Sequence, residues 1–106
     1  MTPIDRLKLL TAWESEPALT EDDLAGALAA TALVDAAGFA PLSETWTPTY
    51  DLNAAAANAW LVKAARAASQ IDGVGDDGSP ASLVFENCRS MARLYAAKRC
   101  ASVSVR

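Results

Sequence analysis

The sequence predicts an all-α protein, a small four-helix bundle with an extended C-terminal arm. Apolar residues recur at intervals of three and four in four segments, which is the spacing of one face of an α-helix. Each segment follows a residue type that caps helices, and stretches rich in Pro, Gly, Ser and Thr separate the segments. A chain of 106 residues has room for one domain. The expected helices span residues 3–15, 20–37, 51–70 and 80–99, within a helical domain of residues 1–100 that is followed by an arm of residues 101–106.

The first two expected helices begin with the same pattern, a Thr followed three residues later by an Asp. In such a capping box each side chain bonds to the backbone N–H of the other residue. Pro3 suits the first position of its helix, where a missing N–H costs nothing. The second helix is expected to end near residue 37, with Gly38 as its C-terminal cap. The two expected boxes pair Thr2 with Asp5 and Thr20 with Asp23.

The segment "FAPLSETWTPT", residues 39–49, contains two prolines and no helical periodicity. It is expected to be an ordered connection rather than a helix. Its three large apolar side chains, Phe39, Leu42 and Trp46, are expected to pack against the bundle.

The third segment, "YDLNAAAANAWLVKAARAA", is the most unusual, because alanines fill most of it. Alanine favours the helix but buries little apolar area, so another helix must pack closely against it. Asp51 is expected to cap this central helix. Leu52, Ala56 and Trp60 share one face of it.

A break at "DGVGDDGSP" precedes the fourth helix, which Ser79 should cap and Pro80 should begin. Residues 73–78 match the G-x-G-x-x-G pattern, but here it follows a helix instead of a strand, so a turn is expected rather than a nucleotide site. A calcium loop is disfavoured as well, because Val74 stands where an oxygen ligand is needed.

Charge is distributed unevenly along the chain. The net charge is −4, yet residues 1–60 hold nine acids against two basic residues, and residues 85–106 hold five basic residues against one acid. In the fourth helix Arg89 and Arg93 are four apart and share a face, which Lys98 and Arg99 approach. These residues either complement the helix dipole or form a docking surface for an acidic partner, and the two roles are compatible.

The composition disfavours several classes of function. The chain has no His, P-loop, nucleophile elbow or zinc-type cysteine pairs, so we expect neither an enzyme nor a bound metal or cofactor. Cys88 and Cys100 would lie about 18 Å apart on one helix, which predicts two reduced thiols. No apolar run reaches the length of a membrane span and no signal peptide is evident, so a cytoplasmic protein without membrane contact is expected.

The order of "PALTEDDLAGALAATALVDAAG", "WTPTYDLNAAAANAWLVKAARAA", a Gly/Asp turn and "SLVFENCRSMARLYAAKR" resembles small head-to-tail adaptor (connector) proteins of long-tailed, double-stranded DNA bacteriophages. The similarity extends from about Pro17 to Val105 and is closest to versions from phages of actinobacteria. The resemblance implies a ring, usually twelve-fold, between the portal protein and a stopper or tail-completion protein in the neck of the virion. DNA would pass through without specific binding, and the ring would assemble in the host cytoplasm.

Two surfaces are expected on this basis. Alanines would let a neighbouring subunit approach closely, and Trp60 would then be either a large anchor at that subunit interface or an ordinary core residue of the monomer. The alternating tail "SVSV" could add to a partner's sheet edge. Two alternatives stay open: another ring of the neck such as a stopper, or a small acidic helical module that binds and regulates one protein partner. The expected subunit interface is Leu52, Ala56 and Trp60, and the expected portal-docking residues are Arg89, Arg93, Lys98, Arg99, Ser102, Val103, Ser104, Val105 and Arg106.

Overall fold

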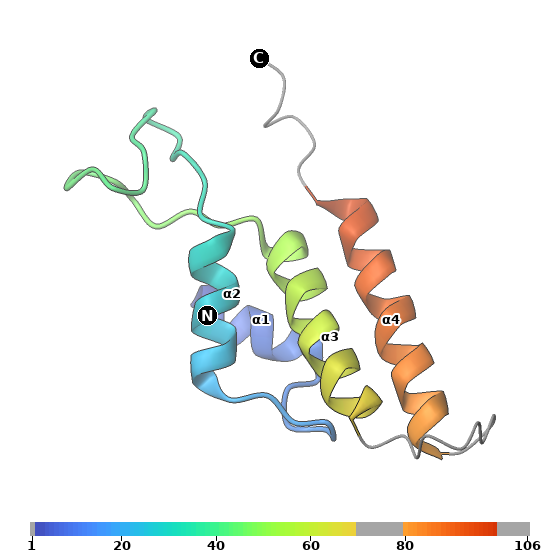
Figure 1. The fold of residues 1–106 in the computed structure, drawn as a ribbon. Helices are drawn as coiled ribbons and strands as arrows, with labels where there is room; N and C mark the ends of the chain where they lie inside the picture. The colour runs from blue at the N-terminus through green and yellow to red at the C-terminus, as the bar shows by residue number, and fades with distance from the viewer. Residues whose placement is uncertain (1, 70–79, 100–106) are drawn as a thin grey trace.

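The computed structural model describes residues 2–69 and 80–99, and in these residues the protein is an all-α, four-helix bundle (Figure 1). The predicted fold class is therefore confirmed. The turn expected near residues 72–79 and the arm of residues 101–106 lie outside the described residues. The helices are α1 (Pro3–Thr11), α2 (Glu21–Ala30), α3 (Leu52–Ala68) and α4 (Pro80–Lys98).

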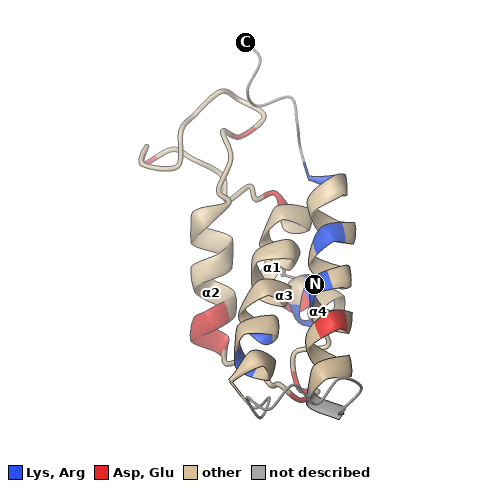
Figure 2. Cartoon of the chain, turned by 45° about the vertical axis from the view of Figure 1, so that its right-hand side comes forward, with Lys and Arg blue, Asp and Glu red and all other residues tan. Residues whose placement is uncertain are grey.

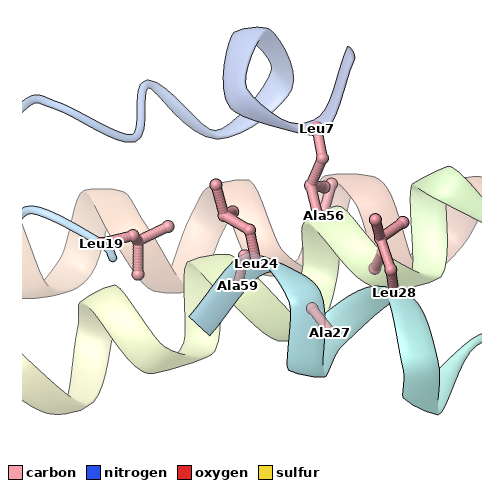
Figure 3. Close-up of a cluster of buried hydrophobic side chains, with 8 residues drawn as sticks. Leu7, Leu19, Leu24, Ala27, Leu28, Ala56 and Ala59 are labelled. Atoms are coloured by element: carbon pink, nitrogen blue, oxygen red, sulfur yellow. The ribbon is translucent and has the colours of Figure 1, made fainter. Parts of the chain in front are cut away.

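Helix α3 is the centre of the bundle, because α1, α2 and α4 all pack against it (Figure 1). Its buried positions are mostly alanines, so the larger side chains of the core come from the elements around it (Figure 3). A second, smaller cluster joins α3 to α4. The first cluster comprises Leu7, Leu19, Leu24, Ala27, Leu28, Ala55, Ala56 and Ala59, and the second comprises Trp60, Ala64, Cys88 and Ala92.

The predicted starts of the first three helices are confirmed by their hydrogen bonds, whereas the Ser79 cap expected for the fourth lies outside the described residues. The backbone N–H of Asp5 donates to the hydroxyl of Thr2 over 3.2 Å, and the carboxylate of Asp5 accepts the N–H of Thr2 in return. Thr20 and Asp23 form the same reciprocal pair at the start of α2. Asp51 caps α3, since its carboxylate accepts the N–H of Ala54 over 3.0 Å. These bonds satisfy donors that the first turn of a helix leaves free.

The expected ends of the first two helices were wrong. Helix α1 stops at Thr11 rather than near residue 15, because Ala12 adopts a left-handed φ of 47°. Helix α2 stops at Ala30 rather than residue 37, and the next residues leave the bundle. Gly38 is not a helix cap: at φ 92° it closes a turn, where its N–H donates to the carbonyl of Asp35.

The α2–α3 loop, residues 31–51, forms the connection expected between the second and third helices. Its two ends pair at an isolated antiparallel bridge between Ala32 and Tyr50. The expectation that its apolar side chains pack on the bundle was wrong for Phe39, which is 42% exposed, and for Leu42, which is 99% exposed. Trp46 does turn inward, but onto the base of the loop, where its ring meets Tyr50 edge to face.

Candidate functional site: a basic groove between α3 and α4

An open groove of about 280 Å³ runs between α3 and α4. We call it the α3–α4 groove. It combines an apolar floor of small side chains with a rim of three arginines. Its lining residues are Ala57, Asn58, Leu61, Arg89, Ala92, Arg93, Ala96 and Arg99.

The groove follows from which residues each helix leaves uncovered. Helix α3 buries most of its circumference and exposes a narrow strip that includes Asn58 and Leu61. Small side chains on the facing side of α4, such as Ala92 and Ala96, leave the space beside this strip open. The amide of Asn53 also donates to the carbonyl of Lys98 over 3.3 Å, so the first turn of α3 lies beside the last turn of α4.

The rim of the groove carries positive charge with little compensation from this chain. Arg89 lies 3.9 Å from Glu86, a long and exposed ion pair, and also sits over the ring of Phe85. Arg93 donates to the hydroxyl of Ser90 over 3.2 Å. Within residues 2–69 and 80–99, neither Arg93 nor Arg99 forms a salt bridge with a carboxylate. The groove can therefore accept carboxylates from another molecule, and an arginine can bind one through two parallel hydrogen bonds.

The structure brings together three of the four basic residues that the sequence singled out. Arg89, Arg93 and Arg99 line the groove, whereas the side-chain nitrogen of Lys98 lies 5.6 Å from the ring centre of Tyr95 and is not part of the lining. Figure 2 shows the basic positions along α4 and the acidic start of α2 on different parts of the bundle. The remaining predicted docking residues, 102–106, lie outside the described residues.

The residues expected at a subunit interface lie inside the chain itself. Ala56 is fully buried, and Leu52 packs against the main core cluster. Trp60 is 7% exposed, and its ring nitrogen donates to the carbonyl of Leu10 over 3.2 Å. The structure therefore favours the core interpretation of Trp60 over the interface interpretation.

A second pocket, of about 270 Å³, lies between α3, α4 and the segment after α1, and Lys63 and Cys88 line it. Burial lowers the pKa of Lys63 and raises the pKa of the Cys88 thiol. The thiol is therefore protonated near neutral pH and is a poor nucleophile. The Lys63 ammonium group is already held by the carbonyls of Ala12 and Ser15, each at 2.9 Å. These contacts hold the segment after α1 against α3.

Leu61 and Lys63 were not recognised from the sequence as functionally or structurally special. Leu61 is the large apolar side chain of the groove floor, and it is 54% exposed. A signal for it existed, because Leu61 lies about 100° around the helix from Trp60 and so off the buried face. For Lys63 the signal was a lone charge among alanines on the buried side of α3. Neither pattern predicts which residues the side chain contacts, because those residues are distant in the sequence.

Comparison with protein-family models, curated proteins and solved structures finds no match to this chain. In the part of the chain that the structure describes, no group of three or more His, Cys, Asp or Glu residues is arranged to hold a metal ion. None of the helices among the described residues combines the length and hydropathy of a membrane span.

Proposed function

We propose that this chain is a structural protein of a bacteriophage neck, an adaptor that forms a ring between the portal protein and the stopper or tail-completion protein. In this role it completes the head, lets DNA pass without specific binding, and resides in the virion after assembly in the host cytoplasm. The resemblance of residues 17–105 to such adaptors motivates the proposal. The small all-α bundle is compatible with it.

The observation that carries a docking role is the α3–α4 groove. Three arginines surround an apolar floor, and the salt bridge that they form within the described residues is the 3.9 Å contact of Arg89 with Glu86. Guanidinium groups without carboxylate partners, next to exposed apolar surface, are typical of a protein-binding surface. The basic surface of α4, which we define as Arg89, Arg93, Lys98 and Arg99, therefore meets carboxylates of adjacent neck proteins, the portal among them.

The net charge of the chain supports passage of DNA rather than binding to it. At −4 per chain, a ring of copies carries a large negative charge, and phosphates adhere to proteins mainly through Lys and Arg. The basic residues that bind protein partners would not face the channel. Binding of the isolated protein to duplex DNA at physiological salt would contradict this part of the proposal.

The test is assembly of purified protein onto tailless heads, scored by the appearance of an adaptor ring. The double variant Arg89→Glu/Arg93→Glu is expected to weaken docking, more strongly at low salt because exposed charges are screened over about 8 Å at physiological ionic strength. Truncation after Cys100 is expected to leave the fold intact and to abolish incorporation. The matched control is Arg6→Glu, a charge reversal at an exposed residue of α1.

Failure of the wild-type chain to join heads, together with one-to-one binding to a single protein, would favour the second candidate function. In that case the chain is a small acidic binding or regulatory module, and the same groove receives its partner. Sedimentation of the free protein with and without portal distinguishes the two, because only an adaptor forms a closed ring on the template.

A further inference from the structure

The α2–α3 loop displays large apolar side chains to solvent. Leu42 is 99% exposed, and Val34 and Phe39 are also exposed. Large apolar side chains that gather on an exposed segment can mark a surface that binds another molecule. The sequence led us to expect these side chains on the bundle, and the structure leaves them available for a partner.

The loop is held in shape by its own hydrogen bonds. The buried carboxylate of Asp35 accepts the backbone N–H groups of Ala37, Phe39 and Thr47 at 3.0, 2.9 and 2.7 Å. The ring nitrogen of Trp46 donates to the carbonyl of Leu33 over 2.8 Å, next to the bridge at the loop's base. A segment ordered in this way loses little conformational entropy when it binds, which favours association.

Helix α4, which carries the arginines of the groove, and helix α2, from which the loop leaves, lie on opposite sides of α3 (Figure 1). The loop leaves the bundle where α3 begins, and α4 ends beside that point, as the bond from Asn53 to Lys98 shows (Figure 1). Two different surfaces on opposite sides of one chain fit a heterologous contact between identical copies. Such contacts repeat around a ring when the rotation between copies closes.

The two surfaces match in chemistry. The loop tip offers Leu42 and, two residues later, the exposed carboxylate of Glu44. The groove offers the apolar side chain of Leu61 beneath a rim that includes Arg93 and Arg99. An apolar tip with one adjacent carboxylate thus faces an apolar floor with cations nearby. A basic occupant would be repelled by the rim, and a wholly apolar one would leave the guanidinium groups unpaired.

We propose that the α2–α3 loop of one copy docks into the α3–α4 groove of the next copy, with Leu42 against Leu61 and Glu44 near Arg93 and Arg99. This inference rests on the proposed ring and names its subunit contact. It also divides the basic surface of α4: Arg93 and Arg99 face the neighbouring copy, and Arg89 and Lys98 are left for the portal.

Cysteine cross-linking between two separately made proteins tests the contact. In a Cys100→Ser background, Leu42→Cys protein is mixed with Leu61→Cys protein and oxidised, both free at millimolar concentration and on tailless heads. Cys88 is buried and does not compete. A disulfide-linked heterodimer is expected. The matched control replaces Leu61→Cys with Leu83→Cys, since Leu83 is similarly exposed on α4 but does not line the groove.

Association of the free protein gives a second measurement, by sedimentation at increasing concentration. Leu42→Ser is expected to weaken self-association about tenfold or more, and Leu83→Ser is expected to leave it unchanged. Glu44→Arg and Arg93→Glu should each weaken it about two- to fivefold, and an equimolar mixture of the two should recover part of the loss, because the loop of one then meets the groove of the other.

The proposal is overturned if Leu42→Cys links to Leu83→Cys as efficiently as to Leu61→Cys, or if no link to Leu61→Cys forms either in solution or on heads. These outcomes are separate from a failure of the proposed function. An adaptor that joins heads without the loop contact contradicts only this inference, whereas a loop contact in a protein that never joins heads contradicts only the neck assignment.

Discussion

The side-chain nitrogen of Lys63, in the middle of α3, lies 2.9 Å from the carbonyl oxygen of Ala12, the residue that ends α1. The same nitrogen donates to the carbonyl of Ser15 and lies 5.0 Å from the ring centre of Trp60. One buried cation thus joins the segment after α1 to the central helix. Ala12 and Ser15 both follow the end of α1, and the carbonyl of Ala12 also accepts the backbone N–H of Ser15.

Replacing Lys63 by Met should destabilise the protein. Methionine fills a similar volume but leaves the carbonyls of Ala12 and Ser15 without this donor. We expect this loss of stability to exceed the gain from no longer burying a charge. We expect the free energy of unfolding in urea to fall by about 1–3 kcal/mol. Lys98→Met, at an exposed site, is the control and should change it by less than about 0.5 kcal/mol. Equal stability of the two variants would show that the Lys63 bonds contribute nothing net.

The pair of Asp23 and Arg66 should make stability sensitive to acid. Arg66 binds both carboxylate oxygens, at 2.7 and 3.1 Å, and with the backbone N–H of Thr20 it lowers the pKa of Asp23 to about 2. Between this pKa and the ordinary value of 3.8 the unfolded chain binds more protons than the folded chain. The contribution of the pair to the free energy of unfolding is therefore present above pH 4 and is lost as the pH falls toward 2. Asp23→Asn should cost about 1–2 kcal/mol at pH 7.

Thermal unfolding followed by circular dichroism from pH 2 to 7 checks this prediction. The difference between wild type and Asp23→Asn should shrink steadily below pH 4. The neighbouring variant Asp22→Asn serves as the control, because Asp22 is exposed on the same turn. If the difference in stability between wild type and Asp23→Asn stays the same at pH 2, the effect of Asp23 does not depend on the ionisation of its carboxylate.

Asp35→Asn should loosen the α2–α3 loop while leaving the helices intact. The amide can place only one oxygen among the three N–H groups that the carboxylate now accepts, and its NH₂ group would face a donor. Hydrogen exchange should therefore accelerate in residues 36–47 while helical circular dichroism stays constant. These same bonds lower the pKa of Asp35, so acid should also release the wild-type loop as the pH falls below 3.8. Protection unchanged in Asp35→Asn would contradict this role.

Trp60→Phe should destabilise the isolated monomer, because it removes the bond to the carbonyl of Leu10 and part of the packing against α4. The expected loss is about 1–3 kcal/mol in urea unfolding. A core residue gives the same loss at every protein concentration, whereas an interface residue gives a loss that appears only where the protein associates. Measurement at micromolar and near-millimolar concentration therefore separates the two interpretations of Trp60.

Local signals predicted the fold well and the tertiary contacts poorly. The capping boxes of Thr2 and Thr20 and the cap of Asp51 act within three residues, so the sequence alone located the helix starts. The early end of α2 was not predicted from the sequence. Residues with high helix propensity, such as Ala36 and Ala37, follow the helix, but the chain leaves it and Ala32 pairs with Tyr50 instead. Tyr50 lies 18 residues after Ala32, so no local sequence pattern indicates this pairing.

For the same reason, only the part of the candidate site that lies on α4 could be predicted from the sequence. The spacing of Arg89 and Arg93 placed them on one face of α4, and the structure puts both on the groove rim. The other wall, with Leu61, comes from α3 and depends on how the two helices cross. The position of the Lys98 ammonium group over the Tyr95 ring likewise depends on a neighbour one turn away.

The alanines of α3 have a consequence for how this protein can change. Ala55, Ala56 and Ala59 have almost no exposed surface and belong to the main core cluster, so a larger side chain at any of them would push its neighbours away. A saturation library should therefore show its lowest tolerance along α3, where even the smallest enlargement is harmful. The loop tip around Leu42 would tolerate replacement as far as folding is concerned. Selection for stability and selection for assembly would then act on separate stretches of the same chain.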